Sequence, residues 1–374
     1  MDHTQPSAAE QTAAAQAATT QPTAAAATTQ PAPAQPAPAP HVPTVYSLGQ
    51  IWVDEMLTLD SFPHPGDFTV AEQAVNAISG SFPVAKAATR MGAQAVIATP
   101  MGDGPFAHNI TTLMHESGIR HIGPVSTQQD NGYRVILNDG EKKTYIKHFG
   151  AETIADAHLY DPVRPETGDV VHILGVALLH STAQGIRRFL DRPESQPDAR
   201  QFRLIITPTS RLGDADIDTV RALAAAKPIW SMNRQEATTL ADNLGITIDE
   251  TLGMRISGGF DDRMFSLCEQ LGNALGSSLV LRGGSHGVWI KHVGHDVQHV
   301  PGFETKGTHI RSAGPCHTGA LCAALAHGMD LQQAAQLANA AASLAIQHNR
   351  HGIPICPTFE EADALVTDRN ESHA

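Results

Sequence analysis

The sequence has few cysteines and few basic residues, and each shortage excludes a class of protein. Its 374 residues include four cysteines, Cys268, Cys316, Cys322 and Cys356, whose spacing matches neither a disulfide framework nor a zinc site. This usage fits a reducing cytoplasm. Lysine and arginine total 25 against 38 acidic residues, which gives a net charge of −13, and no basic stripe is visible. Nucleic acid is therefore not an expected partner.

Long apolar runs are also missing. No stretch reaches the roughly 18 apolar residues of a membrane-spanning helix, so a membrane is not an expected partner. Asp2 stands where a signal peptide is basic, and no apolar run follows it. The 20 histidines are scattered, and we interpret them mostly as surface or core residues rather than metal ligands.

Residues 1–42 are rich in Ala, Gln, Thr and Pro and almost free of charged or large apolar side chains. Such a segment cannot bury enough surface to offset its ordering entropy, so we expect a disordered tail. The rest of the chain can form a sizeable core, since 41% of all residues are hydrophobic. We expect one domain over residues 43–367 and a short C-terminal tail over residues 368–374.

From Val45 onward the chain alternates strand-like and helix-like patterns. Apolar runs such as DVVHILGVAL and RLIITPTS each precede a stretch with helical periodicity. This alternation predicts an α/β fold, with a mostly parallel sheet and helices on both of its faces. The two alternating runs around Asn138-Asp139-Gly140 predict a β-hairpin.

The stretch HIRSAGPCHTGALCAALA, from His309, predicts a strand end, a turn of small residues and then a helix. The small side chains of Ser312, Ala313 and Gly314 let the backbone approach a ligand, and Pro315 suits a first helical turn because its missing N–H would be unpaired there. A helix N-terminus in this setting attracts anions. The alternative is a tight strand-to-helix connection without a ligand.

This stretch, with the LQQAAQLANAAASLAI that follows, resembles the C-terminal signature of the PfkB (ribokinase-like) carbohydrate and nucleoside kinases. The resemblance implies a three-layer α/β/α fold with a mostly parallel central sheet and a small β-sheet lid. In that family a Gly-Ala-Gly turn forms an anion hole, and the Asp that follows deprotonates the substrate hydroxyl. Ser312, Ala313 and Gly314 occupy the anion hole in an ungapped alignment, and Pro315 takes the place of the catalytic Asp.

The resemblance also implies a substrate site. Asp54 follows the first strand, where the family has an Asp that binds sugar hydroxyls; a solvated loop carboxylate is the alternative. Residues 76–93 resemble a glycine-rich loop and helix in which Ser79 and Gly80 stand at the glycine pair. Pro83 stands where an Asn would bind a hydroxyl, and proline has no side-chain donor or acceptor.

The lid is expected from an extended segment at about 54–63 and the hairpin at 132–148. In ribokinase-like proteins this lid covers the substrate and often pairs two subunits, which implies a possible homodimer. The alternative is a surface hairpin with no ligand beneath it.

ATP and Mg²⁺ are the cofactors that the resemblance implies. Asn233 and Glu236 match an N-x-x-E motif that organises Mg²⁺ and phosphate through water, although a helix cap gives the same pattern. The turn LRGGSHG, with Arg282, Gly284 and Gly287, lies where the family binds nucleotide, and Asn339 falls near the expected adenine. The run Ala340 to Ala342 next to Asn339 also has a purely structural interpretation, in which its small side chains permit close packing of helices.

Two functions remain open at this stage. One is an ATP-dependent carbohydrate or nucleoside kinase with impaired catalysis, since His309, Ser312, Pro315 and Pro83 all replace site residues of the family. The other is an inactive kinase-fold protein that binds a sugar, nucleoside or nucleotide in a regulatory role. His317 is a weak candidate for a substitute base, because two helical residues rotate it about 200° from position 315.

The composition of the N-terminal segment leads to a first prediction. A chain that begins at His41 should melt within a few degrees of the full-length protein, because the removed residues cannot contribute to a core. Thermal unfolding of the two chains checks this. A larger fall in melting temperature would mean that the segment docks onto the domain.

Overall fold

The computed structural model describes residues 41–249, 251, 259–305, 313–350 and 353–372. Residues 1–40 of the expected N-terminal tail lie outside the described residues. His309 and Ser312 also lie outside them. The main sheet contains β1 (Thr44–Leu48), β4 (Gln94–Ala98), β5 (Ile119–Ile122), β8 (Val170–Leu174), β9 (Arg203–Thr207), β10 (Ile229–Asn233), β11 (Leu279–Arg282), β12 (Val288–Lys291) and β13 (Gln298–Val300). The α-helices are α1 (Ser81–Arg90), α2 (Pro105–Glu116), α3 (Ala183–Leu190), α4 (Ile217–Ala225), α5 (Arg234–Leu244), α7 (Phe260–Leu275), α8 (Ala313–Ala326), α9 (Leu331–Gln347) and α10 (Phe359–Ser372).

The main sheet has the strand order β13-β12-β11-β10-β9-β8-β1-β4-β5. All neighbours from β11 to β5 pair in parallel, whereas β12 and β13 join at one edge as antiparallel strands. The prediction of a mostly parallel sheet is therefore confirmed.

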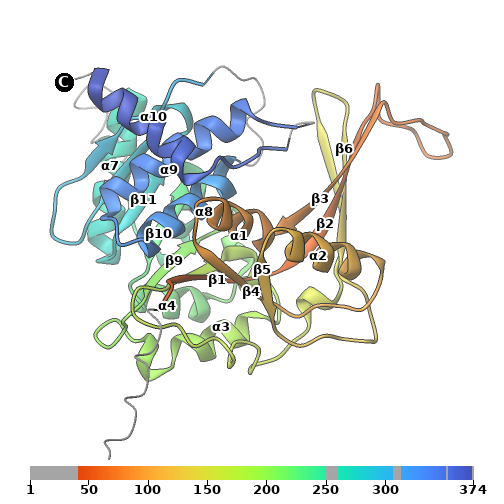
Figure 1. The fold of residues 1–374 in the computed structure, drawn as a ribbon, viewed down its shortest axis with the longest axis horizontal. Coiled ribbons are helices and arrows are strands. Elements are labelled where there is room, and N and C mark those ends of the chain that lie inside the picture. Colours follow the sequence, from red (N-terminus) through yellow and green to blue (C-terminus); the bar gives the residue numbers. More distant parts are fainter. Residues whose placement is uncertain (1–40, 250, 252–258, 306–312, 351–352, 373–374) are drawn as a thin grey trace, which may run out of the picture. The chain divides into compact units, whose positions relative to one another are not determined.

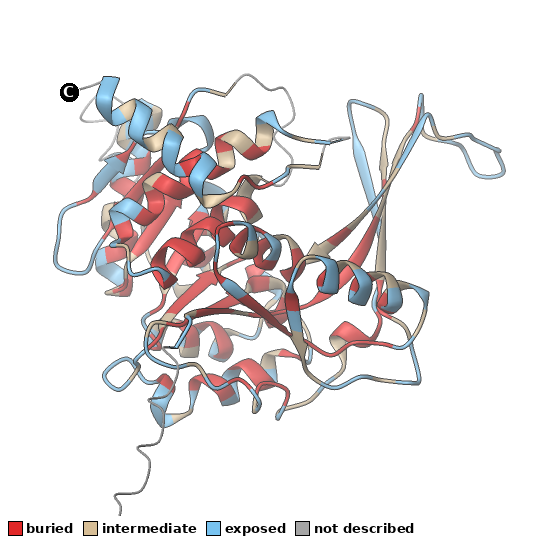
Figure 2. Cartoon of the chain, in the orientation of Figure 1, coloured by how far each residue is buried: buried red, intermediate tan, exposed pale blue. Residues whose placement is uncertain are grey.

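Two layers of helices cover the two faces of this sheet (Figure 1). Side chains alternate along each strand, so Ile205 of β9 packs with α1, α8 and α9, whereas Leu204 and Ile206 pack with α3, α4, α5 and α7. Both interfaces are apolar and buried (Figure 2). The result is the expected three-layer α/β/α arrangement.

A second sheet, which we call the lid sheet, has the order β3-β2-β6-β7 and extends to the right of the main sheet in Figure 1. Its strands are β2 (Ile51–Thr58), β3 (Gln73–Gly80), β6 (Tyr133–Asn138) and β7 (Lys143–His148). The hairpin expected at 132–148 is confirmed as β6 and β7, and the Asp139 carboxylate closes its turn by accepting from the N–H groups of Glu141 and Lys142.

Two expectations about the lid sheet need correction. The strand expected at about 54–63 ends at Thr58, because the chain bends at Asp60 and Ser61 and then turns through Pro65 and Gly66. The residues before α1 form the strand β3, which pairs with β2 over its full length, where the sequence suggested a loop. Pairing with a neighbouring strand gave β3 its conformation, although its own sequence has a weak strand pattern.

The C-terminal boundary also differs from the expected one. Helix α10 continues through Ser372, so residues 368–372 are helical rather than part of a tail. The guanidinium of Arg369 lies 3.8 Å from the centre of the Phe303 ring and donates to the carbonyl oxygen of Pro301. These contacts attach the last turns of the helix to the domain.

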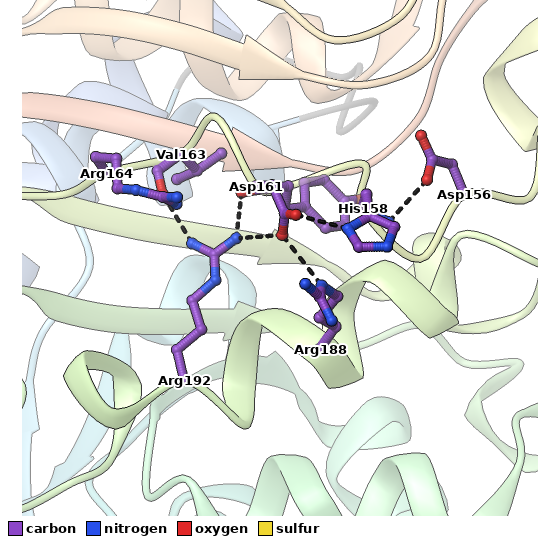
Figure 3. Close-up of polar contacts among 8 residues, drawn as sticks. Asp156, His158, Asp161, Val163, Arg164, Arg188 and Arg192 are labelled. Atoms are coloured by element: carbon purple, nitrogen blue, oxygen red, sulfur yellow. Dashed lines mark hydrogen bonds and ion pairs between the residues drawn. The ribbon is translucent and has the colours of Figure 1, made fainter.

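A cluster of ionic contacts anchors the loop before β8 to α3 (Figure 3). Arg192 donates to the carbonyl oxygens of Tyr160 and Val163 at 2.6 and 2.8 Å and to Asp161 at 3.2 Å. Asp161 also accepts from Arg188 and pairs with His158. Hydrogen bonds from these two side chains hold the pKa of the Asp161 carboxyl well below its usual range.

Helix α8 packs unusually close to α1. A Cβ at Gly319 would lie 2.3 Å from the carbonyl oxygen of Val84 and 2.5 Å from the Cβ of Ala87. The missing side chain therefore permits the approach of the two helices.

This packing leads to a prediction about stability. Gly319→Ala should lower the free energy of unfolding by about 1–3 kcal/mol, because the new methyl group forces the two helices apart. Gly213→Ala is the matched control, since Gly213 is exposed and the nearest atom to its added Cβ would be 3.7 Å away. Urea denaturation of both variants checks this, and equal stabilities would contradict the packing argument.

Candidate active site

The carboxyl ends of the parallel strands meet at one edge of the main sheet. Asn233 ends β10 and Arg282 ends β11, and the two residues are register partners. Open α/β sheets bind ligands at this edge. The first turn of α8 lies close by, since the guanidinium of Arg282 would lie 2.7 Å from a Cβ on Gly314.

A cavity of about 400 Å³ opens at this edge, and we call it the nucleotide cavity because the residues expected to bind nucleotide line it. It brings together residues that the sequence placed in three separate motifs: Asn233, Arg282, Gly284, Gly287, Ala313, Gly314, His317 and Asn339. Its apolar part is formed by Val288, Phe303 and Ile346. The expected nucleotide-binding residues therefore share one cavity, whereas Glu236, which was expected near Mg²⁺, does not line it and pairs with Arg282.

Two positions of the LRGGSHG turn require glycine for steric reasons. Gly284 and Gly287 have φ values of +64° and +92°, which favour glycine. A Cβ on Gly287 would lie 2.2 Å from the carbonyl oxygen of Val300. The turn can thus close against the chain after β13 and form one wall of the cavity.

Asn233 and Glu236 form a capping box at the start of α5. The Asn233 side chain accepts from the Glu236 N–H at 2.9 Å, and the Glu236 carboxylate accepts from the Asn233 N–H at 2.8 Å. The same carboxylate oxygen pairs with Arg282 at 3.1 Å. The N-x-x-E motif therefore acts as a helix cap, and the Glu236 carboxylate already has a cationic partner in Arg282.

These contacts do not fit a residue that organises Mg²⁺. A magnesium ion bound to phosphates usually needs one or two carboxylates. Glu236 is engaged with Arg282 instead, and no carboxylate lines the nucleotide cavity among the described residues. The part of the chain that the structure describes also holds no group of three or more potential metal ligands.

His317 is buried in the wall of the nucleotide cavity. The Asn339 amide donates to the carbonyl oxygens of Val300 and Pro301, so its oxygen faces His317 Nε2 at 3.2 Å and Nε2 carries the proton. Burial lowers the pKa of His317 to about 3. His317 is therefore neutral, and it faces the nucleotide cavity rather than the substrate cavity, a position that does not suit a substitute for the family's catalytic Asp.

A second cavity of about 280 Å³ lies between the lid sheet and α1, and we call it the substrate cavity because residues expected to bind substrate line it. The expected substrate residues Asp54, Ser79 and Pro83 line it, together with Lys86, Arg90, Cys316 and the chain from Ile353 to Cys356. Gly80 follows Ser79 at the end of β3 and is the N-cap residue of α1, with a φ of +78°. A Cβ there would lie 2.1 Å from the carbonyl oxygen of Gln50.

The carboxylate of Asp54 has more partners than the sequence suggested. It accepts from Trp52 Nε1 at 2.8 Å, from Ser79 Oγ at 2.5 Å, and from Nε and a terminal nitrogen of Arg134 at 2.9 and 2.6 Å. These four bonds fill its acceptor sites. Asp54 lies at the expected place, but a sugar hydroxyl would have to displace one of these donors.

Three buried polar side-chain atoms close in sequence to the lid-sheet strands were not predicted from the sequence. Gln50 Oε1, Ser81 Oγ and Glu152 Oε1 have no hydrogen-bond partner among the described residues. Gln50 and Ser81 are bonded through their backbones, and Glu152 accepts from the N–H of Gly132. The three residues lie outside the motifs quoted above, and no sequence pattern predicts that their side chains are buried. None of the three residues is among those that line the two cavities.

Pro315 lies in the first turn of α8, between the two cavities. Ala313, Gly314 and His317 face the nucleotide cavity, whereas Cys316 faces the substrate cavity. The helix accommodates a proline there, because the N–H groups of a first turn have no partner within the helix. A base at position 315 would lie at the boundary between the two cavities, and proline supplies neither a base nor an N–H.

The arrangement of a mostly parallel sheet, a separate lid sheet and two cavities at the strand ends defines a ribokinase-like α/β protein. The chain belongs to the pfkB family of carbohydrate kinases, whose family model matches residues 80–358. It is 26% identical over 322 residues to the uncharacterized sugar kinase YegV of Escherichia coli (strain K12), covering 85% of this chain and 92% of that protein.

Solved structures of ribokinases share the fold. The ribokinase from Cryptococcus neoformans var. grubii serotype A, in complex with ADP, matches 88% of this chain and 100% of its own with a TM-score of 0.67 and 16% identity. The Arabidopsis thaliana ribokinase complexed with ribose and ATP matches 87% and 99% with a TM-score of 0.64 and 15% identity.

The helices of the part of the chain that the structure describes are all too short or too polar to span a lipid bilayer.

Lys147 on the lid sheet provides a test by pH. Its ammonium lies 3.5 Å from the ring centre of Trp52 and 5.0 Å from that of Phe149. Burial lowers the pKa of Lys147 from an ordinary 10.5 to about 8, so the folded protein binds this proton more weakly than the unfolded chain. Burying the charge thus destabilises the fold below pH 8, and this effect disappears as the pH rises toward 10.5.

We therefore expect wild-type protein to gain stability relative to Lys147→Met as the pH rises from about 8 toward 10.5. Urea denaturation of both proteins across this range measures the difference in their free energies of unfolding. Parallel pH profiles would show that Lys147 titrates normally.

Proposed function

We propose that this protein is a PfkB-type sugar or nucleoside kinase whose phosphoryl transfer is impaired. It binds a nucleotide such as ATP in the nucleotide cavity and a small polyhydroxyl substrate in the substrate cavity. The observation that supports this most is the position of Pro315, between two cavities whose walls carry the remaining family residues.

In such a transfer the substrate oxygen attacks the terminal phosphorus, the new O–P bond forms, and ADP leaves as the old P–O bond breaks. The backbone N–H groups at the start of α8 stabilise the charge on the phosphoryl group. The hydroxyl proton has no side-chain acceptor at position 315 and passes to water or to a phosphate oxygen. A positioned base contributes about 10²–10⁴-fold, so the rate is low. No step passes through Mg²⁺, because Glu236 is paired with Arg282.

A second candidate is an inactive member that only binds its ligands and acts in regulation. The saturation of Asp54 favours it, because this carboxylate already holds Arg134, Trp52 and Ser79. Turnover measurements separate the two candidates.

The proposed location is the cytoplasm, and the proposed assembly is a homodimer formed through the lid sheet. The four cysteines are buried free thiols, which suits a reducing cytoplasm. Tyr145 and Ile146 of β7 are more than half exposed, and pairing of two lid sheets would cover such residues in a homodimer.

Pro315→Asp should raise phosphoryl transfer by at least about tenfold, because it places a carboxylate where the substrate proton leaves. The measurement is phosphate transfer from ATP to a panel of sugars and nucleosides, for wild type and variant. Adding Pro83→Asn would restore a hydroxyl contact as well.

The matched control is Pro315→Ala, which restores the backbone N–H and supplies no base. It should leave the rate within about threefold of wild type, since one backbone hydrogen bond contributes modestly. Rapid wild-type turnover that Pro315→Asp fails to improve, and that His317→Ala abolishes, would show that the chemistry uses another base.

A further inference from the structure

The Arg282 guanidinium gives the nucleotide cavity a positive charge. Arg282 is the cation in its wall, and none of the described residues that line it is an aspartate or a glutamate. A nucleotide would thus meet a guanidinium at the phosphate end and the apolar surface of Val288, Phe303 and Ile346 elsewhere. This inference rests on the proposed function, because it concerns the same cavity.

The Arg282 side chain is held in one orientation and is 14% exposed. One terminal nitrogen pairs with Glu236, and the other lies 2.7 Å from the position of a Cβ on Gly314. Its buried Nε has no partner among the described residues. The terminal nitrogen beside Gly314 makes no hydrogen bond among the described residues, and it is the donor that a phosphate oxygen next to Gly314 would meet.

The position that would organise a magnesium ion is occupied by this same cation. The carboxylate of Glu236 accepts from Arg282 and from the backbone N–H of Asn233. A divalent ion at Glu236 would lie beside the guanidinium and be repelled by it. Breaking the Glu236–Arg282 pair to admit the ion would leave a partly buried charge without its partner.

We propose that the Arg282 guanidinium takes the place of the metal ion and that this protein binds nucleotide phosphates without a divalent cation. The guanidinium suits this role because its planar donors match phosphate oxygens and its charge does not depend on pH. Glu236 then positions Arg282 rather than a hydrated metal.

The test is calorimetric titration of the full-length protein with ADP, once with EDTA and once with excess MgCl₂. For wild type we expect dissociation constants that agree within about threefold, since the metal adds no protein contact. Arg282→Gln should weaken binding in EDTA by about tenfold or more, because it removes a charge-assisted contact. It should also make binding stronger with MgCl₂ than with EDTA, because Glu236 is released from its partner.

Two further variants separate loss of charge from loss of structure. Glu236→Gln breaks the same ion pair but keeps the guanidinium, so it should still bind ADP in EDTA within about threefold of wild type. Arg221→Gln is the matched control, because it removes an exposed arginine that is paired with Asp218. Melting temperatures without ligand verify that each variant folds.

The outcomes are distinguishable. Wild-type binding that requires MgCl₂, or an Arg282→Gln variant that binds ADP in EDTA as tightly as wild type, would overturn this inference and leave the nucleotide site in place. Absence of ADP binding under both conditions would overturn the nucleotide site itself, and the inference with it.

Discussion

The close contact between α8 and α1 determines where both cavities form. Gly319 lets the backbone of α8 approach the carbonyl oxygen of Val84 in α1. The first turn of α8 is thereby fixed at the edge of the main sheet, with Arg282 on one side and the lid sheet on the other. Because the first turn of α8 separates the two cavities, Pro315 lies between them.

The polar groups around this turn are engaged with one another to an unusual degree. Glu236 pairs with Arg282, and Asp54 holds Arg134, Trp52 and Ser79. In each case a carboxylate that could bind a ligand is neutralised by an arginine of the same chain. The Arg282 guanidinium nevertheless lines the nucleotide cavity, which favours an anionic ligand there.

Much of the fold followed from local patterns. The alternation of strands and helices predicted the parallel sheet, and the Asn-Asp-Gly turn predicted the hairpin of β6 and β7. Local patterns failed where pairing decides the structure, since β3 becomes a strand by lying along β2. They also failed at α10, whose last turns depend on contacts with Phe303 and Pro301.

For the site, the sequence by itself determined which residues stand at the family positions, including a proline in place of the base, because motif spacing and side-chain chemistry are local properties. Only the tertiary structure decided the partners of those residues. Arg134 lies 80 residues from Asp54, and Arg282 lies 46 residues from Glu236. Such partners become neighbours only when β2 pairs with β6 and β10 with β11, so their charges cannot be balanced from the sequence alone.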